Sequence, residues 1–288
     1  MTLNQKSRAI FYVLCSACCF ALMNLFVRLS GDLPSIQKSF FRNAVAVCFA
    51  FIMLLRSGKR IGWKKGNLPL LIVRSTFGTL GILCNFYAVD HLLLSDATML
   101  NKLSPFFAIL FSFFFLQEKI KPFQLLGILG AFLGSLLIIK PGFQVQEITP
   151  YLIGVLGGLG AGAAYTAVRG LGQRGERGPF IVFFFSAFSC LVTLPWLIFD
   201  YHPMALWQFG TLLLAGLAAA GGQFSITAAY THAPAREISV FDYTQVIFSA
   251  LFGFIAFSQI PDLWSILGYI IICGVSVVMF FYNNRQEG

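Results

Sequence analysis

Charged side chains inside long apolar stretches are the residues of this sequence with the clearest potential for chemistry. Arg28, Arg42 and Lys102 fall in the predicted outer halves of three apolar segments, and Asp242 is the one acid that we place well inside a segment. A charged side chain inside a bilayer costs at least about 2.5 kcal/mol and usually faces a cavity or a partner. The excess of cations over acids therefore predicts a site that binds an anionic group.

Uncharged polar residues accompany these charges. Asn24 lies one helical turn before Arg28, on the same face. The predicted substrate-binding residues are Asn24, Arg28, Arg42, Arg74, Asn85, Tyr87, Asn101, Lys102, Tyr165, Gln223, Asp242, Tyr243 and Gln245. Asp242 is also the predicted coupling or gating residue, since a lone membrane carboxylate can exchange protons as its surroundings change. The alternatives are snorkelling of Arg28, Arg42 and Lys102 to lipid headgroups, and a structural salt bridge for Asp242.

The sequence carries no motif for a cofactor or a catalytic centre. Cys15-x-x-Cys18-Cys19 lacks a second pair of ligands and clustered histidines, so we predict no metal site. A Gly-rich ATP-binding loop, a His-Glu-x-x-His motif and a serine nucleophile elbow are all missing from the sequence. We therefore predict no cofactor and no enzymatic activity.

The composition indicates which elements must position these residues. Hydrophobic residues make up 58% of the 288 residues and charged residues 11%, whereas a soluble domain has about 25% charged residues. This composition predicts an all-α integral membrane protein with ten transmembrane helices. The ten apolar segments are 9–29, 36–56, 68–90, 95–116, 123–140, 151–171, 179–199, 207–229, 234–257 and 263–282.

The distribution of Lys and Arg predicts the orientation in the membrane. The net charge is +9, and with both termini in the cytoplasm the inner loops and segment ends hold 14 of the 20 Lys and Arg residues. Outer loops then keep only Lys38 and Lys140, and the acids Asp32, Asp90 and Asp96 lie at the outer rim. This bias follows the positive-inside rule and explains the net charge without nucleic-acid binding.

An internal repeat relates the two halves of the chain. A shift of 141 residues places Val27-Arg28 on Val168-Arg169, and His91 on His232. The predicted units are residues 1–143 and 144–288. Each unit has five helices, an odd number, so the second unit must be inserted in the opposite direction. Inverted repeats of this kind are typical of secondary transporters, which hold their substrate near the midplane between the repeats.

Residues 104–127, in the fourth and fifth segments, carry a family resemblance. Ser104-Pro105, Gln117-Glu118 and Gln124-Leu125-Leu126-Gly127 resemble the proline-containing fourth helix, the helix-end acid and the fifth-helix glycine of the drug/metabolite transporter superfamily, EamA type. The second half departs from this pattern, with Val246 in place of the proline and Gln259 in place of the acid. The resemblance covers nearly the whole chain and implies a ten-helix transporter.

We therefore predict a secondary active transporter that moves a small polar metabolite by alternating access. The expected substrate is an amino acid or a related solute with a carboxylate or phosphate, since cation exporters need an acidic cavity. The alternatives are a multidrug or organic-cation exporter of the same superfamily, or, in another class, a membrane enzyme or a channel. The expected setting is a bacterial inner membrane, with the lipid bilayer and the substrate as partners, as a monomer or weak homodimer.

Overall fold

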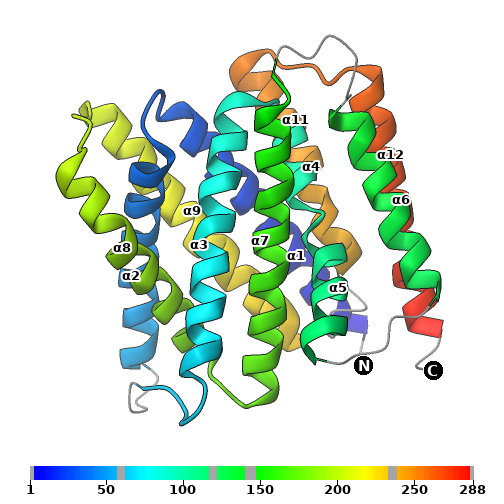
Figure 1. The fold of residues 1–288 in the computed structure, drawn as a ribbon, viewed down its shortest axis with the longest axis horizontal. Helices are drawn as coiled ribbons and strands as arrows, with labels where there is room; N and C mark the ends of the chain where they lie inside the picture. The colour runs from blue at the N-terminus through cyan, green and yellow to red at the C-terminus, as the bar shows by residue number, and fades with distance from the viewer. Residues whose placement is uncertain (1–2, 57–61, 117–121, 140–146, 233–238, 286–288) are drawn as a thin grey trace.

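The structure is a computed structural model that describes residues 3–56, 62–116, 122–139, 147–232 and 239–285 (Figure 1). Each of the ten predicted segments corresponds to a helix or to a pair of consecutive helices. The elements are α1 (Leu3–Leu29), α2 (Ser35–Arg56), α3 (Leu68–His91), α4 (Leu94–Asn101), α5 (Ser104–Leu116), α6 (Pro122–Ile139), α7 (Thr149–Gln173), α8 (Gly178–Phe199), α9 (Leu206–His232), the 3-10 helix η1 (Ser239–Tyr243), α11 (Thr244–Phe257) and α12 (Leu263–Arg285).

The lengths and hydropathies of these helices fit a membrane. Seven helical stretches of the described chain are long and apolar enough to cross a bilayer, and three shorter apolar helices lie at 125–139, 241–257 and 263–279. Together they account for the ten segments. The predicted fold class, an all-α multi-pass membrane protein, is confirmed.

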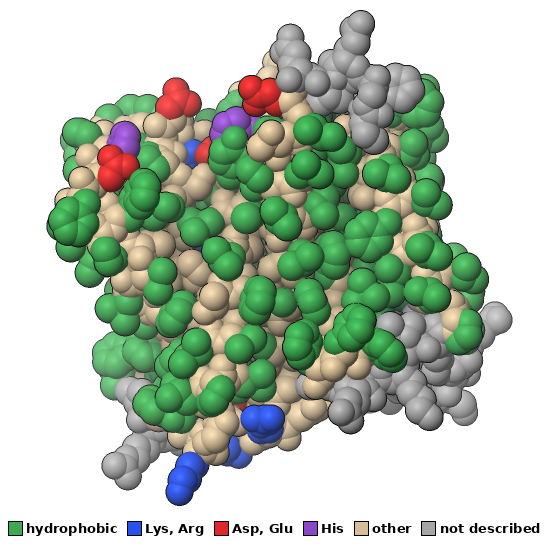
Figure 2. Space-filling model, in the orientation of Figure 1, with side chains coloured by type: hydrophobic (Ala, Val, Ile, Leu, Met, Phe, Trp, Pro, Cys, Tyr) green, Lys and Arg blue, Asp and Glu red, His purple; other side chains and the backbone are tan. Residues whose placement is uncertain are grey.

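The surface has the bands expected of a membrane protein. In Figure 2, Lys and Arg side chains gather at the lower end of the molecule, acids and histidines at the upper end, and hydrophobic side chains cover the middle. Helix α1 begins and α12 ends at the lower end (Figure 1). We call this lower end the inner end, following the predicted orientation, and the opposite end the outer end.

The helices pack in a pattern that the repeat explains. Helix α1 packs on α9, and its repeat partner α7 packs on α3, the repeat partner of α9. Helices α2 and α8 pack on each other, as do α6 and α12 at one edge of the bundle (Figure 1). Small residues allow close approach: a Cβ on Gly81 of α3 would lie 3.0 Å from the backbone nitrogen of Ala161 in α7.

Two helices that the sequence predicts as continuous are interrupted. The segment 95–116 breaks at Lys102 and Leu103, because Pro105 has no N–H to donate to the carbonyl of Asn101 and its ring crowds that carbonyl. The segment 234–257 changes from 3-10 to α geometry after Tyr243, the repeat equivalent of Lys102; its residues 234–238 lie outside the described residues. Discontinuous helices at equivalent positions are a feature of transporter substrate sites.

Candidate substrate-binding site

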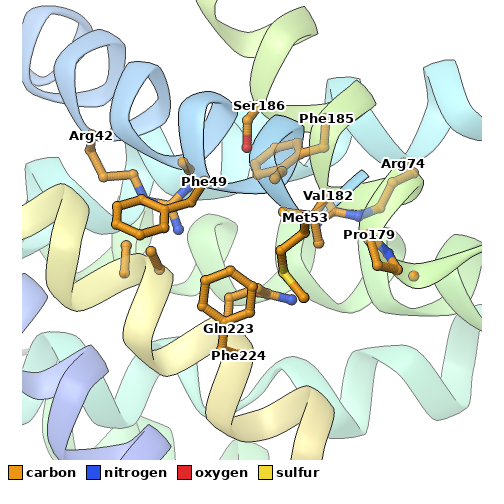
Figure 3. Close-up of a pocket in the computed structure, with 15 residues that line it drawn as sticks. Arg42, Phe49, Met53, Arg74, Pro179, Val182, Phe185, Ser186, Gln223 and Phe224 are labelled. Carbon is orange, nitrogen blue, oxygen red and sulfur yellow. The ribbon is translucent and has the colours of Figure 1, made fainter. Parts of the chain in front are cut away.

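A pocket lies between α2 and α3 of the first repeat and α8 and α9 of the second (Figure 3). It encloses about 600 Å³ of empty space, counted to its open mouth. It extends from Arg42 to the inner end, where Gly178 and Pro179 begin α8. The lining residues are Arg42, Ala46, Phe49, Ala50, Met53, Arg74, Gly178, Pro179, Val182, Phe185, Ser186, Ala219, Ala220, Gln223 and Phe224. Three predicted site residues, Arg42, Arg74 and Gln223, are therefore brought together.

Arg42 lies at the outer limit of this pocket and is only 7% exposed. One terminal nitrogen donates to Oδ1 of Asn43 at 2.7 Å. Asn43 in turn donates to the hydroxyl of Ser189 on α8 at 2.9 Å, so the α2–α8 contact holds this arrangement. The Nε of Arg42 has no hydrogen-bond partner in the described part of the chain. A buried guanidinium with a free donor is suited to bind a carboxylate or phosphate oxygen.

Arg74 approaches the same pocket from α3. Its guanidinium carbon lies 4.0 Å from the ring centre of Phe185 on α8, in a cation–π contact. Its Nε likewise finds no hydrogen-bond partner among the described residues. Gly78, one turn along α3, leaves the room that this arrangement needs, because a Cβ there would collide with the guanidinium and lie 2.9 Å from the Phe185 ring.

The rest of the lining is mostly apolar and aromatic. Figure 3 shows Arg42 and Arg74 at opposite sides of the pocket, with Phe49, Met53 and Phe224 between them. The hydroxyl of Ser186, a fully buried residue, lacks a hydrogen-bond partner within the described chain. The pocket thus presents a guanidinium at each side and a mostly apolar lining with Gln223 and Ser186 between them, which suits an organic molecule with anionic groups on a hydrophobic body.

The two interrupted helices meet at an ion pair. Nζ of Lys102, between α4 and α5, contacts Oδ2 of Asp242 in η1. The hydroxyl of Tyr243 donates to the carbonyl of Lys102 at 3.3 Å. The Lys102 side chain is 10% exposed and that of Asp242 30% exposed, so the pair is mostly buried. Asn101, half-buried, is next to this contact in the chain.

This ion pair corrects the expected charge distribution. The sequence placed Lys102 in the outer half of its segment and gave a structural salt bridge as the alternative for Asp242, and the structure shows this salt bridge with Lys102 as the partner. The breaks in the two helices, at Lys102 and after Tyr243, lie at this contact. Lys102 is therefore paired, and Arg42 and Arg74, rather than Arg42 and Lys102, are the cations that offer free donors to a ligand.

A polar network links α1, α3, α4 and α11 beside the ion pair. Asn85 donates to Asn24 Oδ1 at 3.3 Å, and Asn24 donates to the hydroxyl of Thr98 at 3.4 Å. The hydroxyls of Thr98 and Ser249 are 2.8 Å apart. These residues are buried, and Oδ1 of Asn85 has no hydrogen-bond partner within the described chain. Asn24 and Asn85 join neighbouring helices and line neither of the two pockets.

At the outer end of the bundle, a cation of α1 and a cation of α2 bind the end of α3 and so close this end. Nζ of Lys38 lies 2.7 Å from both carboxylate oxygens of Asp90, and the Lys38 side chain is completely buried. Arg28 donates to the carbonyls of Val89, at 3.0 Å, and Leu92. The prediction that Lys38 belongs to an outer loop is wrong, because α2 begins at Ser35 and includes it in its first turn.

A second pocket lies outside this closure. It is lined by Arg28, Gly31, Asp32, Leu33, Pro34, Ser35, Tyr87, Asp90, His91, His202 and Phe257. Two predicted site residues, Arg28 and Tyr87, therefore belong to the outer pocket and not to the inner one. Asp96, expected at the rim, is 1% exposed and accepts a hydrogen bond from Tyr269. Among the described residues, no group of three His, Cys, Asp or Glu side chains is placed to hold a metal ion.

Two remaining candidates, Tyr165 and Gln245, do not line the inner pocket. Tyr165 of α7 is close enough to Arg42, Arg74 and Asp242 to interact with their charges. Gln245 is buried in the first turn of α11. Glu118, the helix-end acid of the family resemblance, lies outside the described residues.

The inner mouth carries one acid with an altered pKa. Burial acts to raise the pKa of Glu176, but hydrogen bonds from the Asn67 side chain and from the backbone N–H groups of Lys64 and Arg177, together with the Lys64 charge, hold it below its usual value. Glu176 thereby joins the loop before α3 to the turn between α7 and α8. This contact is at the inner end of the pocket-forming helices.

The sequence reasoning missed the apolar walls and the outer closure. The sequence contains 33 phenylalanines, and no pattern in it distinguishes those that line the pocket, such as Phe49, Phe185 and Phe224, from those that face lipid. Lys38 carried a usable signal, since it lies one helical turn before Arg42 on the same face of α2. Ser186 carried none.

Comparisons with known proteins agree with this architecture. The model of the EamA-like transporter family matches residues 7–140 and again residues 148–281, two matches that begin 141 residues apart. The chain is 33% identical to the pseudopaline exporter CntI of Pseudomonas aeruginosa over 275 residues, 94% of this chain and 95% of that protein. It is 28% identical to a riboflavin transporter of Brucella anthropi over 289 residues, 95% and 96% of the two chains. A crystal structure of a protein with 16% identity has the same fold, with a TM-score of 0.68 over 98% of this chain and 99% of that one.

Proposed function

Because the chain belongs to the EamA-like transporter family, we propose that it is a secondary transporter that carries a small organic anion by alternating access. The family and the relatives named above are membrane transporters and not enzymes. The proposed substrate has a carboxylate or phosphate and an apolar or aromatic body. The proposed setting is a bacterial inner membrane, with both termini in the cytoplasm and a monomer or weak homodimer as the functional unit.

The observation that supports an anionic substrate is the positive charge of the inner pocket. Arg42 and Arg74 reach it with free donors, and its 15 lining residues, all in the described part of the chain, include no Asp or Glu. A lipophilic cation would meet two like charges there, which disfavours binding. An anion satisfies both guanidinium groups and removes the cost of leaving them unpaired in a low-dielectric site. The relatives carry different cargoes by name, so the pocket and not the similarity supports this choice.

The arrangement of the two pockets supports alternating access. The inner pocket extends to the inner end, while Lys38, Arg28 and Asp90 close the outer end. The inner pocket is lined by α2 and α3 of the proposed unit 1–143 and by α8 and α9 of the proposed unit 144–288. Movement of α2, α8 and α9 relative to α3, which packs mainly on α7, would expose the site to one side at a time.

A counterflow experiment in liposomes tests the proposal. The probes are terephthalate, a benzene ring with two carboxylates, and a matched cation with two trimethylammonium groups on the same ring; neither crosses a bilayer readily. The proposal expects saturable terephthalate uptake that is stimulated by terephthalate on the opposite side and unaffected by the cation. Uptake of the cation, or its competition with terephthalate, would instead support the multidrug alternative. Absence of trans-stimulation for any of a panel of carboxylates and phosphates would remove the carrier mechanism.

A further inference from the structure

Three cations of the first repeat follow one another from the outer end to the inner end. Lys38 and Arg42 are one turn apart on α2, and Arg74 of α3 lies at the far side of the inner pocket. Within the described part of the chain, Lys38 alone of these three has a carboxylate partner, and it is the most buried, with no exposed surface. Its partner Asp90 contacts it through both oxygens at 2.7 Å.

The Lys38–Asp90 contact adjoins the outer pocket, which Asp90 lines while Lys38 lies buried behind it. Asp90 and Arg28 both line that pocket, which has about 980 Å³ of empty space up to its open mouth. Arg28 lies 4.9 Å from the ring centre of Phe257, another lining residue. Ser35 lines the outer pocket and Arg42 the inner one; seven residues of helix separate them, a rise of about 10 Å. A single polar layer therefore separates the two pockets.

This layer joins helices that pack most extensively on different neighbours. Helix α2 packs mainly on α8 and α9, and α1 on α9, whereas α3 packs mainly on α7. The contacts of Lys38 and Arg28 with Asp90, Val89 and Leu92 cross from α2 and α1 to the end of α3. Opening the outer end must separate these contacts. Lys38 would then lose the Asp90 carboxylate, which is costly for as long as its ammonium stays buried; Asp32, which also lines the outer pocket, is the second acid whose charge acts on Lys38.

We propose that the outer pocket is a second binding site for the substrate's carboxylate, formed by Lys38 with Arg28 beside it, and that Asp90 occupies this site while the outer end is closed. The substrate's carboxylate takes the place of the Asp90 carboxylate when the outer end opens. One carboxylate replaces another, so Lys38 keeps an anionic partner in both states. The identity of the ligand as the transported anion rests on the proposed function; the carboxylate site at Lys38 does not.

Chemical rescue tests the site without any knowledge of the substrate. Asp90→Ala removes the resident carboxylate and leaves a space beside Lys38. Acetate should then fill it, so that sodium acetate raises the thermal unfolding midpoint of D90A in detergent by several degrees above sodium chloride at equal concentration. Wild type should show no such acetate effect, because Asp90 occupies the site. The double variant Lys38→Gln with Asp90→Ala should show none either, because the cation is gone.

A second measurement covers the case in which D90A folds poorly, and it connects the site to transport. Lys38→Gln with Asp90→Asn removes both charges together, which avoids leaving one buried charge unpaired. In oriented liposomes, terephthalate entering from the outer side should then need at least about a tenfold higher concentration for half-maximal uptake, while half-saturation from the inner side stays unchanged. Lys38→Arg with Asp90 intact should retain outer-side uptake.

The outcomes separate the two proposals. Equal acetate effects in D90A and in the double variant, or an unchanged outer half-saturation in K38Q/D90N, would overturn the second site. Failure of wild type to carry terephthalate or any other carboxylate or phosphate of the panel, together with acetate rescue of D90A, would contradict the proposed function and leave the carboxylate site standing.

Discussion

The two repeats share their packing and differ in their charges. The repeat relates the contact of α1 with α9 to the contact of α7 with α3. In the contacts of α2 with α8 and of α6 with α12, the two helices are repeat equivalents of each other. The charges do not follow this symmetry: Lys38, Arg42, Arg74 and Lys102 of the first repeat correspond to Pro179, Phe183, Ala215 and Tyr243 of the second. The packing of the scaffold is thus symmetric, while the cations of the proposed anion site belong to one repeat.

The second repeat contributes the counter-charge instead. Asp242 stands at the repeat equivalent of Asn101 and pairs with Lys102 across the interface of the two breaks. The comparison therefore separates two roles. Arg42 and Arg74 are available to a ligand, whereas Lys102 and Asp242 bind each other and connect the repeats.

The largest effect is expected at this connection. Asp242→Asn removes the acid of the second repeat, and we expect it to abolish gradient-driven accumulation of substrate while some exchange remains. The reason is that Asp242 is our candidate for proton coupling or closure of the central gate. Accumulation and counterflow are measured side by side in liposomes.

A charge swap provides the control for this variant. The double variant Lys102→Asp with Asp242→Lys keeps an ion pair of reversed polarity, so it preserves the ionic contact between the two repeats. If Asp242→Asn leaves concentrative uptake unchanged, Asp242 is only a structural partner of Lys102, and the second repeat contributes no coupling residue.

A smaller loss is expected from the cations of the first repeat. Arg42→Gln should weaken binding of the substrate by roughly 1.5–3 kcal/mol, the range for a hydrogen bond to a charged group. Lys102→Gln should cost less, because Lys102 already has a carboxylate partner. Isothermal titration of the purified protein measures both. Lys65→Gln, a change at an exposed lysine of the inner end, is the matched control and should bind as wild type does.

Gly78→Ala should act on Arg74 indirectly. The added Cβ would collide with the guanidinium, which then has to leave the Phe185 ring. Losing this contact should weaken binding by about 0.5–2 kcal/mol, the range of a cation–π interaction. Gly210→Ala on α9 is the control, because nothing lies within 4 Å of its Cβ position. Equal binding by G78A and wild type would show that the position of Arg74 over Phe185 does not matter for recognition.

The smallest effect is expected at the inner mouth. Hydrogen bonds hold the pKa of Glu176 below its usual value, so this group stabilises the fold above the pKa of an unfolded glutamate, about 4.3, and the contribution disappears as the pH falls through the lower folded pKa. The stability difference between wild type and Glu176→Gln should therefore stay constant from about pH 7 to about pH 5 and shrink as the pH falls below about 4. A difference that is constant with pH would assign the effect to packing alone.

The fold was largely predictable from the sequence because membrane insertion imposes a simple rule. Each spanning helix needs a long apolar run, and the polar turns between runs are easy to recognise. The predicted bounds 36–56 and 179–199 differ from α2 and α8 by one residue at their starts. The interruptions at Lys102 and Tyr243 were not predicted. Pro105 was a signal for the first, whereas the second has no proline.

The site was predictable in its residue types and not in its pairings. Burial cost marks Arg42, Arg74 and Asp242 as candidates from the sequence alone. Which of them remain free depends on contacts between helices far apart in the chain, such as that of Lys102 with Asp242, and no periodicity encodes these contacts. Lys38 shows the same limit, since its partner Asp90 is 52 residues away.

Binding of terephthalate to wild type, to Arg42→Gln, to Arg74→Gln and to the variant with both changes tests the central claim most directly, since that claim assigns anion recognition to the first repeat. The account predicts weaker binding in each single variant and loss of saturable binding in the double variant, with thermal unfolding midpoints close to that of wild type. Wild-type affinity in the double variant, or binding of the matched bis(trimethylammonium) cation in its place, would contradict the account.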